Sequence, residues 1–169
     1  AIVCKLSAER IAELERLAAG LGLPAGAVIC TGFVPDEDLV GLVCHSTLLV
    51  YPSLYEGLGL PVLEAYGCGT PVVGSNTSSI AELILPELAC DPADPASIAA
   101  AMHRATTDHP LRRRGLAFGR RLLTDELGWD RAADRVLAAL VPGRRRAIAP
   151  TAVERVAVVA ALPPARTGI

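Results

Sequence analysis

Short apolar stretches alternate with amphipathic patterns through the first half of the chain. Apolar, often β-branched stretches predict strands at residues 1–4, 27–33, 47–53, 71–75 and about 87–91. Apolar positions at helical spacing between them predict helices, after Ser7 as far as Gly20, from Asp36, from about Pro61 to Tyr66, and from Ser78 or Ser79. Ser7 and Asp36 are residue types suited to cap the first two of these helices.

Strands that alternate with helices across short turns indicate parallel strands joined by right-handed crossovers. The sequence therefore predicts an α/β fold with a Rossmann-like parallel sheet covered by helices on both faces. The stretch at 47–53 is apolar almost throughout, as expected for a strand buried on both faces. Ligands of such sheets bind at the carboxyl ends of the strands, which places residues 32–35, 53–60 and 75–79 along one rim.

Beyond residue 94 the pattern becomes helical. Asp94 is suited to cap a helix at 95–107, and helices are predicted at about 110–126 and, opened by Trp129, at 129–140. Residues 1–141 are expected to form one domain, followed by a linker or disordered tail at 142–169. The chain begins inside an expected strand without an initiator Met, so we expect a piece of a longer protein.

The bulk composition excludes some classes of protein. The chain is 51% hydrophobic with a net charge of −2, which gives no general attraction to nucleic acid. No apolar run is long enough for a membrane-spanning helix, and the N-terminus lacks the layout of a signal peptide.

The five cysteines form no CxxC pair; Cys4, Cys30, Cys44 and Cys90 lie in or beside apolar stretches. We expect them to fill the core in a reducing cytoplasm, without a disulfide framework or metal cluster.

The stretch YEGLGLPVLE at residues 55–64 carries the chemistry of the predicted rim. Pro61 suits the first position of a helix, so the preceding loop leads to a helix N-terminus that attracts anions. Gly57 and Gly59 let the backbone approach a bound phosphate closely. Carboxylates repel phosphate but accept hydrogen bonds from sugar hydroxyls, so Glu56 and Glu64 favour a ligand built from a sugar, a diphosphate, a ribose and a base.

Residues 52–79, PSLYEGLGLPVLEAYGCGTPVVGSNTSS, resemble the E-x7-E signature of the retaining family-4 glycosyltransferases, which have the GT-B fold. The blocks TGFVPDEDL, GTPVV, SNTSSIAEL and WDRAADRVLAAL follow in the order of that family's C-terminal half, so the resemblance covers roughly residues 1 to 140. It implies the C-terminal half of a GT-B fold, lacking its first strand–helix unit, with a helical C-terminal segment. The SNTSS loop is most similar to bacterial mannosyltransferases of the group.

The resemblance also implies roles for individual residues. Glu64 would hold the nucleotide ribose, and Glu56 would contact the donor sugar as the catalytic residue. Leu58 replaces the family's usual Phe. The remaining donor-binding residues would be Gly57, Leu58, Gly59 and Leu60, which meet the donor sugar and phosphates, and Phe33, Val34 and Pro35, which lie against the base.

The implied activity is a retaining hexosyltransferase that moves a sugar from GDP-mannose or a UDP-sugar to a glycan, lipid or small-molecule hydroxyl. No cofactor or metal is implied. The family's basic residues for the leaving diphosphate lie upstream of this chain, so the chain alone is expected to be inactive. The parent protein is expected in the cytoplasm, with peripheral contact to the inner face of the membrane. The open alternatives are a non-catalytic nucleotide-binding or interaction module and, fitting less well, another GT-B enzyme such as an epimerase or a phosphorylase.

Overall fold

The computed structural model describes residues 1–140. Close contacts divide the chain into two units, residues 1–131 and 132–169. The expected tail at 142–169 lies outside the described residues, as do Pro142 and Gly143, which were expected to end the last helix. Everything that positions the candidate site belongs to the first unit.

The N-terminal part of the first unit is built on helix α1 (Ala8–Gly20), whose predicted cap is confirmed: the Ser7 hydroxyl accepts a hydrogen bond from the Arg10 N–H at 3.3 Å. The strands predicted at 1–4 and 27–33 are reduced to one parallel bridge between Ile2 and Cys30. A strand is stabilised mainly by packing of its side chains against neighbouring strands, and here Val3 and Ile29 remain exposed. The prediction of two full strands was therefore wrong.

Helix α2 spans Asp36–Cys44. With Asp36 as its cap the helix would have begun at residue 37, one residue later. Pro35 occupies the capping position, and Asp36 is instead the first helical residue. The prediction of Asp36 as the cap was wrong because the proline already ends the extended turn and fixes the entry to the helix. Acidic residues still fill the first turn, where they suit the positive end of the helix dipole.

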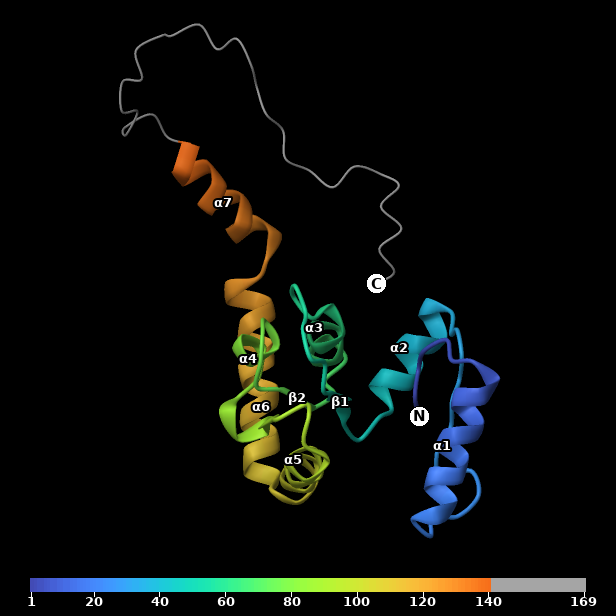
Figure 1. Ribbon diagram of the computed structural model, residues 1–169. Helices are drawn as coiled ribbons and strands as arrows, with labels where there is room; N and C mark the ends of the chain where they lie inside the picture. The colour runs from blue at the N-terminus through green and yellow to red at the C-terminus, as the bar shows by residue number, and fades with distance from the viewer. Residues whose placement is uncertain (141–169) are drawn as a thin grey trace, which may run out of the picture. The chain divides into compact units, whose positions relative to one another are not determined.

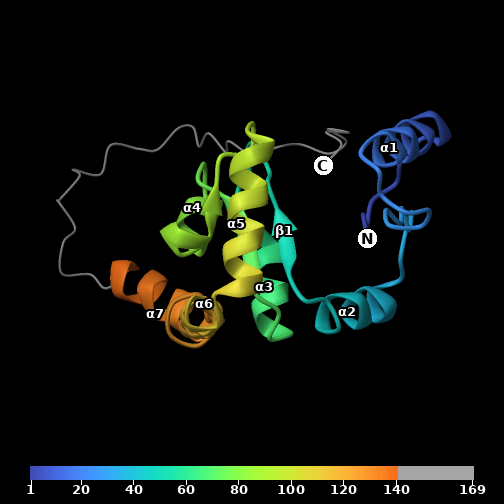
Figure 2. The same cartoon turned by 90° about the horizontal axis from the view of Figure 1, so that it is seen from below.

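The central sheet contains three parallel strands in the order β1 (Leu49–Tyr51), β2 (Val72–Ser75), β3 (Ala89–Cys90). Helix α3 (Leu60–Gly67) connects β1 to β2, while α4 (Ile80–Leu83) and a 3₁₀ turn (Pro86–Leu88) connect β2 to β3. Figures 1 and 2 show α3 on one face of this sheet and α5 (Pro95–Thr107) on the other. The α/β fold with a parallel sheet and helices on both faces is confirmed.

Burial differs between the strands. Every residue of β2 is buried, whereas every residue of β1 is only partly buried. The expectation that 47–53 is buried on both faces was therefore wrong, because β1 is an edge strand that pairs with β2 alone. Strand β1 is also shorter than the strand predicted at 47–53. Its free side borders a hollow of about 370 Å³ whose opposite wall includes Ile2 and Val3.

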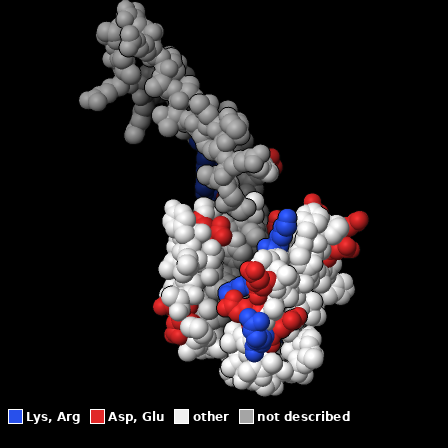
Figure 3. Space-filling view, turned by 45° about the vertical axis from the view of Figure 1, so that its right-hand side comes forward, with Lys and Arg blue, Asp and Glu red and all other residues white. Residues whose placement is uncertain are grey.

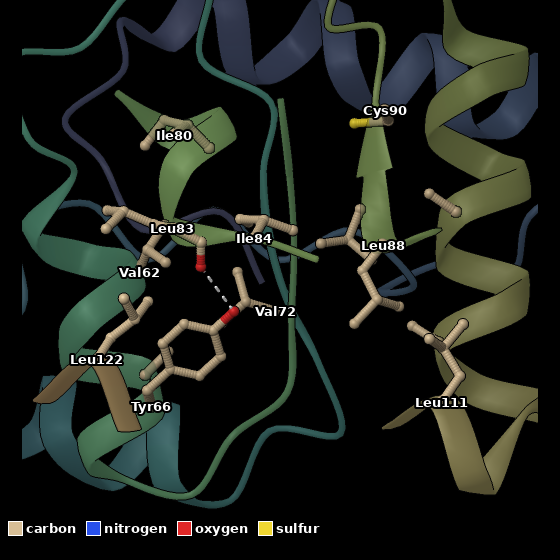
Figure 4. Close-up of a cluster of buried hydrophobic side chains, with 14 residues drawn as sticks. Val62, Tyr66, Val72, Ile80, Leu83, Ile84, Leu88, Cys90, Leu111 and Leu122 are labelled. Atoms are coloured by element: carbon tan, nitrogen blue, oxygen red, sulfur yellow. Dashed lines mark hydrogen bonds between the residues drawn. The ribbon is translucent and has the colours of Figure 1, made fainter. Parts of the chain in front are cut away.

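The hydrophobic core fills the space between the sheet and helices α3 to α6 (Figure 4). Tyr66 of α3 belongs to this core, 6% exposed, and its hydroxyl donates a hydrogen bond to the Leu83 carbonyl at 3.1 Å. Burial raises the pKa of Tyr66 well above its ordinary value. The phenol thus remains a neutral donor and ties α3 to α4.

The helices after the sheet largely follow their local signals. The Asp94 carboxylate caps α5 by accepting the Ala96 N–H at 2.9 Å, as predicted. The helix predicted at 110–126 is α6 (His109–Arg121), continued by a π-helical turn (Leu122–Glu126). Helix α7 (Trp129–Leu140) has the predicted bounds.

On the face in Figure 3, Lys and Arg side chains lie among Asp and Glu side chains.

The cysteines do not follow the expectation of core filling. Cys90 is buried, but Cys4 and Cys44 are exposed, and Cys30 and Cys68 are partly buried. The sequence reasoning was wrong here because an apolar neighbourhood along the chain does not ensure cover from the rest of the fold.

The close contact between α6 and α3 generates a prediction. A Cβ on Gly119 would lie 2.2 Å from Cγ of the buried Tyr66 ring. Gly119→Ala should therefore lower the free energy of unfolding by about 1–3 kcal/mol, measured by urea denaturation. Gly41→Ala in α2 is the control, since its Cβ meets nothing within 4 Å and better helix propensity should leave stability equal or higher by up to about 1 kcal/mol. Equal effects of the two substitutions would contradict this packing.

Candidate functional site

The loop after β1 places Glu56 beside two hydroxyl groups. Its carboxylate oxygen Oε1 accepts hydrogen bonds from the Tyr51 hydroxyl at 2.6 Å and from the Ser53 hydroxyl at 2.9 Å. Glu56 is partly buried, so these bonds are partly shielded from water. The carboxylate is held in one orientation and keeps acceptor capacity for a further donor.

The loop after β2 fixes the backbone of the same residue. The Glu56 N–H donates to Ser78 Oγ at 3.2 Å, and the Ser79 hydroxyl donates to the Glu56 carbonyl at 3.0 Å. Thr77 adds a hydrogen bond to the Leu54 carbonyl at 3.3 Å. The two rim segments predicted at 53–60 and 75–79 therefore meet, as the parallel sheet requires.

Ser78 and Ser79 do not act as the helix caps that their position suggested. Ser79 stands at the capping position of α4 but makes no capping hydrogen bond with its side chain. Ser78 has a φ of 52°, a left-handed conformation unusual for a serine. Both hydroxyls instead reach back across the rim to the Glu56 backbone.

Gly59 brings the loop close to α4 and opens helix α3. It caps α3 with a φ of 92°, and a Cβ there would lie 2.3 Å from Cδ1 of the fully buried Ile80. A side chain at this position is therefore excluded on two counts. Gly57 differs, because a Cβ there would meet nothing within 4 Å. Leu58 and Leu60 are exposed beside these glycines, and Pro61 is the second residue of α3, one place later in the helix than predicted.

Glu64 lies one turn into α3, exposed, at the opposite end of the loop from Glu56. With Tyr51 and Pro61 it lines the hollow of about 370 Å³ beside β1, whose other walls are mostly apolar. The charges on Glu56 and Glu64 both reach Tyr51. Burial, the hydrogen bond to Glu56 and these two charges, in that order, raise the pKa of Tyr51 to about 12.

The turn at 33–35 makes no hydrogen bond to this loop within the described part of the chain. Phe33 is 84% exposed, and within residues 1–140 no hydrogen bond joins the turn to the segment around Glu56. Val34 lines a separate open hollow with Glu37 and His45. The structure thus brings Glu56, Glu64 and the intervening loop together, without a hydrogen bond from the expected base-binding turn in the described residues.

Sequence reasoning missed Tyr51 as a residue of the site and placed Ser53 on the rim without a role. Strand alternation was the available signal, because residues 51 and 53 would share one side of the strand predicted at 47–53. Within residues 1–140, no group of three or more His, Cys, Asp or Glu side chains is placed to hold a metal ion. In the same region no helix is both long and apolar enough to cross a membrane.

The pKa of Tyr51 makes the site sensitive to alkaline pH. Because the pKa is raised from 10.0 in the folded chain, the neutral hydroxyl stabilises the fold below pH 10, and this contribution is lost as the pH rises toward about 12. Across that window the free energy of unfolding should fall more steeply for the wild type than for Tyr51→Phe, measured by urea denaturation at each pH. Parallel curves for the two proteins would show that Tyr51 does not hold its proton in this way.

The chain is similar in sequence to several bacterial mannosyltransferases. It is 43% identical over 105 residues to the serotype-specific mannosyltransferase WbdA of Escherichia coli, covering 62% of this chain and 13% of WbdA. It is 37% identical over 123 residues to the O-antigen chain mannosyltransferase B of Escherichia coli, covering 70% and 31%. It is also 37% identical over 131 residues to a GDP-mannose-dependent alpha-(1-6)-phosphatidylinositol dimannoside mannosyltransferase of Mycobacterium tuberculosis, covering 76% and 32%. The chain thus spans less than a third of each of these relatives.

The fold is similar to that of a solved GT-B enzyme, the sucrose-phosphate synthase from Thermosynechococcus elongatus. The TM-score is 0.64 at 25% sequence identity, covering 81% of this chain and 38% of the synthase. The family model described as glycosyl transferases group 1 matches residues 2–108, a range that contains Glu56, Glu64 and both loops of the rim. The chain belongs to the glycosyl transferases of group 1 and has the parallel α/β architecture of a GT-B domain.

Proposed function

We propose that this chain is the domain of a retaining hexosyltransferase that binds the nucleotide-diphosphate sugar donor. The observation that carries the proposal is the arrangement of two carboxylates at the two ends of one loop and helix N-terminus. Glu56 is oriented by Tyr51 and Ser53, while Glu64 lies at the hollow beside β1. A sugar and a ribose joined by a diphosphate match this order of groups.

The diphosphate would lie between the carboxylates. Pro61 has no N–H and the Val62 N–H donates to the Gly59 carbonyl at 3.0 Å, so the donors to the diphosphate would be the N–H groups of residues 57–60. The positive end of the α3 dipole also favours an anion there. A Cβ on Gly57 would meet nothing within 4 Å, so a phosphate can approach the backbone there. Gly59 keeps the loop against α4 and so fixes the direction of these N–H groups.

The ribose would lie at Glu64 and the donor sugar at Glu56. An ionised carboxylate accepts hydrogen bonds from two neighbouring hydroxyls, which suits the 2′ and 3′ hydroxyls of a ribose at the exposed Glu64. The Glu56 carboxylate already accepts two hydroxyl donors from the protein, so its remaining acceptor sites face a restricted set of directions. This restriction favours one placement of the sugar. The exposed Phe33 and its turn remain the proposed contact for the base.

We further propose mannose as the transferred sugar and GDP as its carrier. The support is the similarity to three mannosyltransferases, one of which is described as GDP-mannose-dependent. In the proposed reaction an acceptor hydroxyl attacks the anomeric carbon on the face from which the diphosphate departs. The leaving phosphate takes the hydroxyl proton. Basic groups from outside this chain are expected to neutralise that phosphate, so the chain alone should bind the nucleotide without transferring sugar.

Calorimetric titration of the chain with GDP, UDP and ADP tests the proposal, with Glu64→Gln as the variant. This change keeps the shape of the side chain and removes the charge that the ribose hydroxyls would meet. Hydrogen bonds to charged groups contribute about 1.5–3 kcal/mol, so GDP binding should weaken about tenfold or more. Glu9→Gln in α1 is the matched control, an exposed glutamate on a different element that should leave affinity unchanged.

Two results would contradict the proposal. Unchanged GDP affinity in Glu64→Gln would remove Glu64 from the ribose site. A folded chain that binds none of the three nucleotides would argue against nucleotide binding by this domain, and circular dichroism of the same sample shows whether it is folded.

A further inference from the structure

Two cysteines lie where the C-terminal ends of α2 and α3 meet. Cys44 is the last residue of α2, and Cys68 directly follows α3. The Thr70 hydroxyl donates a hydrogen bond to the Val43 carbonyl at 2.7 Å, and Thr70 is only 1% exposed. This shielded bond joins the residue before Cys44 to the turn that contains Cys68.

The same two helix ends share a hollow of about 300 Å³. Val40 and Val43 of α2 line it together with Glu64 and Cys68 from the α3 side. Within this arrangement the neighbouring Cys44 thiol is the largest cause of a raised pKa at the Cys68 thiol. Burial and the nearby charge of Glu64 act in the same direction. The two sulfur atoms are thus neighbours in the folded chain.

The pair is also accessible to a reagent in solution. Cys44 is exposed and Cys68 is partly buried. Cys90 offers a contrast, because it is 2% exposed and its thiol donates to the Gly74 carbonyl at 3.3 Å. A small disulfide in solution therefore reaches Cys44 more readily than Cys68.

We propose that Cys44 and Cys68 form a reversible disulfide that joins α2 to α3, with a small disulfide such as oxidised glutathione as the oxidant. The Cys44 thiolate attacks one sulfur of oxidised glutathione, forms a mixed disulfide and releases one glutathione thiolate. The Cys68 thiolate then attacks the Cys44 sulfur and releases the second glutathione. The protein loses two protons and two electrons, and the oxidant is reduced to two glutathione molecules.

The disulfide would connect two elements of the candidate site. Helix α2 follows the turn at 33–35, and α3 carries Glu64 one turn before Cys68, whose N–H donates to the Glu64 carbonyl at 3.0 Å. A covalent link between distant parts of the chain restricts the unfolded state, so oxidation should raise the midpoint of thermal unfolding. The proposal does not depend on the function proposed for the site.

Peptide mapping after oxidation tests the proposal. The folded chain is treated with oxidised glutathione, the remaining thiols are alkylated, and the protein is cleaved after glutamate, because no Lys or Arg lies between Arg16 and Arg104. Cleavage after Glu37, Glu56, Glu64 and Glu82 puts the two cysteines in separate peptides, 38–56 and 65–82. We expect these peptides to be joined, with a mass lower by two hydrogen atoms than their sum.

Matched variants sharpen the test. Cys68→Ser should leave glutathione attached to Cys44 and abolish the rise in the thermal midpoint, whereas Cys30→Ser should change neither result. Glutathione retained on Cys44 in the wild type, with Cys68 alkylated, would overturn the proposal. A linked peptide that also forms in urea with equal yield would overturn it as well, because the fold would then not be what pairs the thiols.

Discussion

The candidate site depends on the attachment of the loop after β1 to the loop after β2. Two hydrogen bonds provide this attachment: the Glu56 N–H donates to the Ser78 hydroxyl oxygen, and the Ser79 hydroxyl donates to the Glu56 carbonyl. Gly59 also lies too close to Ile80 for any side chain to replace its hydrogen. These contacts decide where α3 begins. Since α3 carries Glu64, they also decide how the two carboxylates are spaced.

The chemistry of the site follows from this geometry. Tyr51 keeps its proton because burial and the neighbouring carboxylates raise its pKa, and so it can donate to Glu56. Ser53 donates to the same oxygen atom, which leaves the rest of the carboxylate to accept from a ligand. A loop that only closed a turn would not need an oriented carboxylate at its start and a second one a turn into the following helix. The arrangement is consistent with the proposed ligand, which carries hydroxyls at both ends.

Much of the fold could be predicted because its signals are local. Ser7, Asp94 and Trp129 mark helix starts through residue type and position, and the buried strand β2 begins with two valines, Val72 and Val73. The strands at 1–4 and 27–33 were over-predicted because an apolar run becomes a strand only where neighbouring strands cover it. The difference between β1 and β2 has the same origin, since sequence does not show which strand lies at the edge.

The site was predictable in part. The spacing of Glu56 and Glu64 around two glycines and a proline was visible in the sequence, and the structure places these residues around one loop. The roles of Tyr51, Ser78 and Ser79 depend on which side chains face the loop across the rim, a tertiary property. The contact between Cys44 and Cys68 is likewise absent from any local pattern, because it joins the ends of two helices separated by a strand.

The central claim is that the loop between Glu56 and Glu64 binds a nucleotide diphosphate. Nuclear magnetic resonance of the ¹⁵N-labelled chain, titrated with GDP, tests it most directly because each backbone N–H reports its own surroundings. The account predicts the largest shifts at residues 57–60 and at Glu64, with small shifts in α1 and α5. Shifts concentrated instead at the hollow on α6 lined by Arg113, Arg120 and Arg121 would contradict it, since the diphosphate would then be bound by surface arginines.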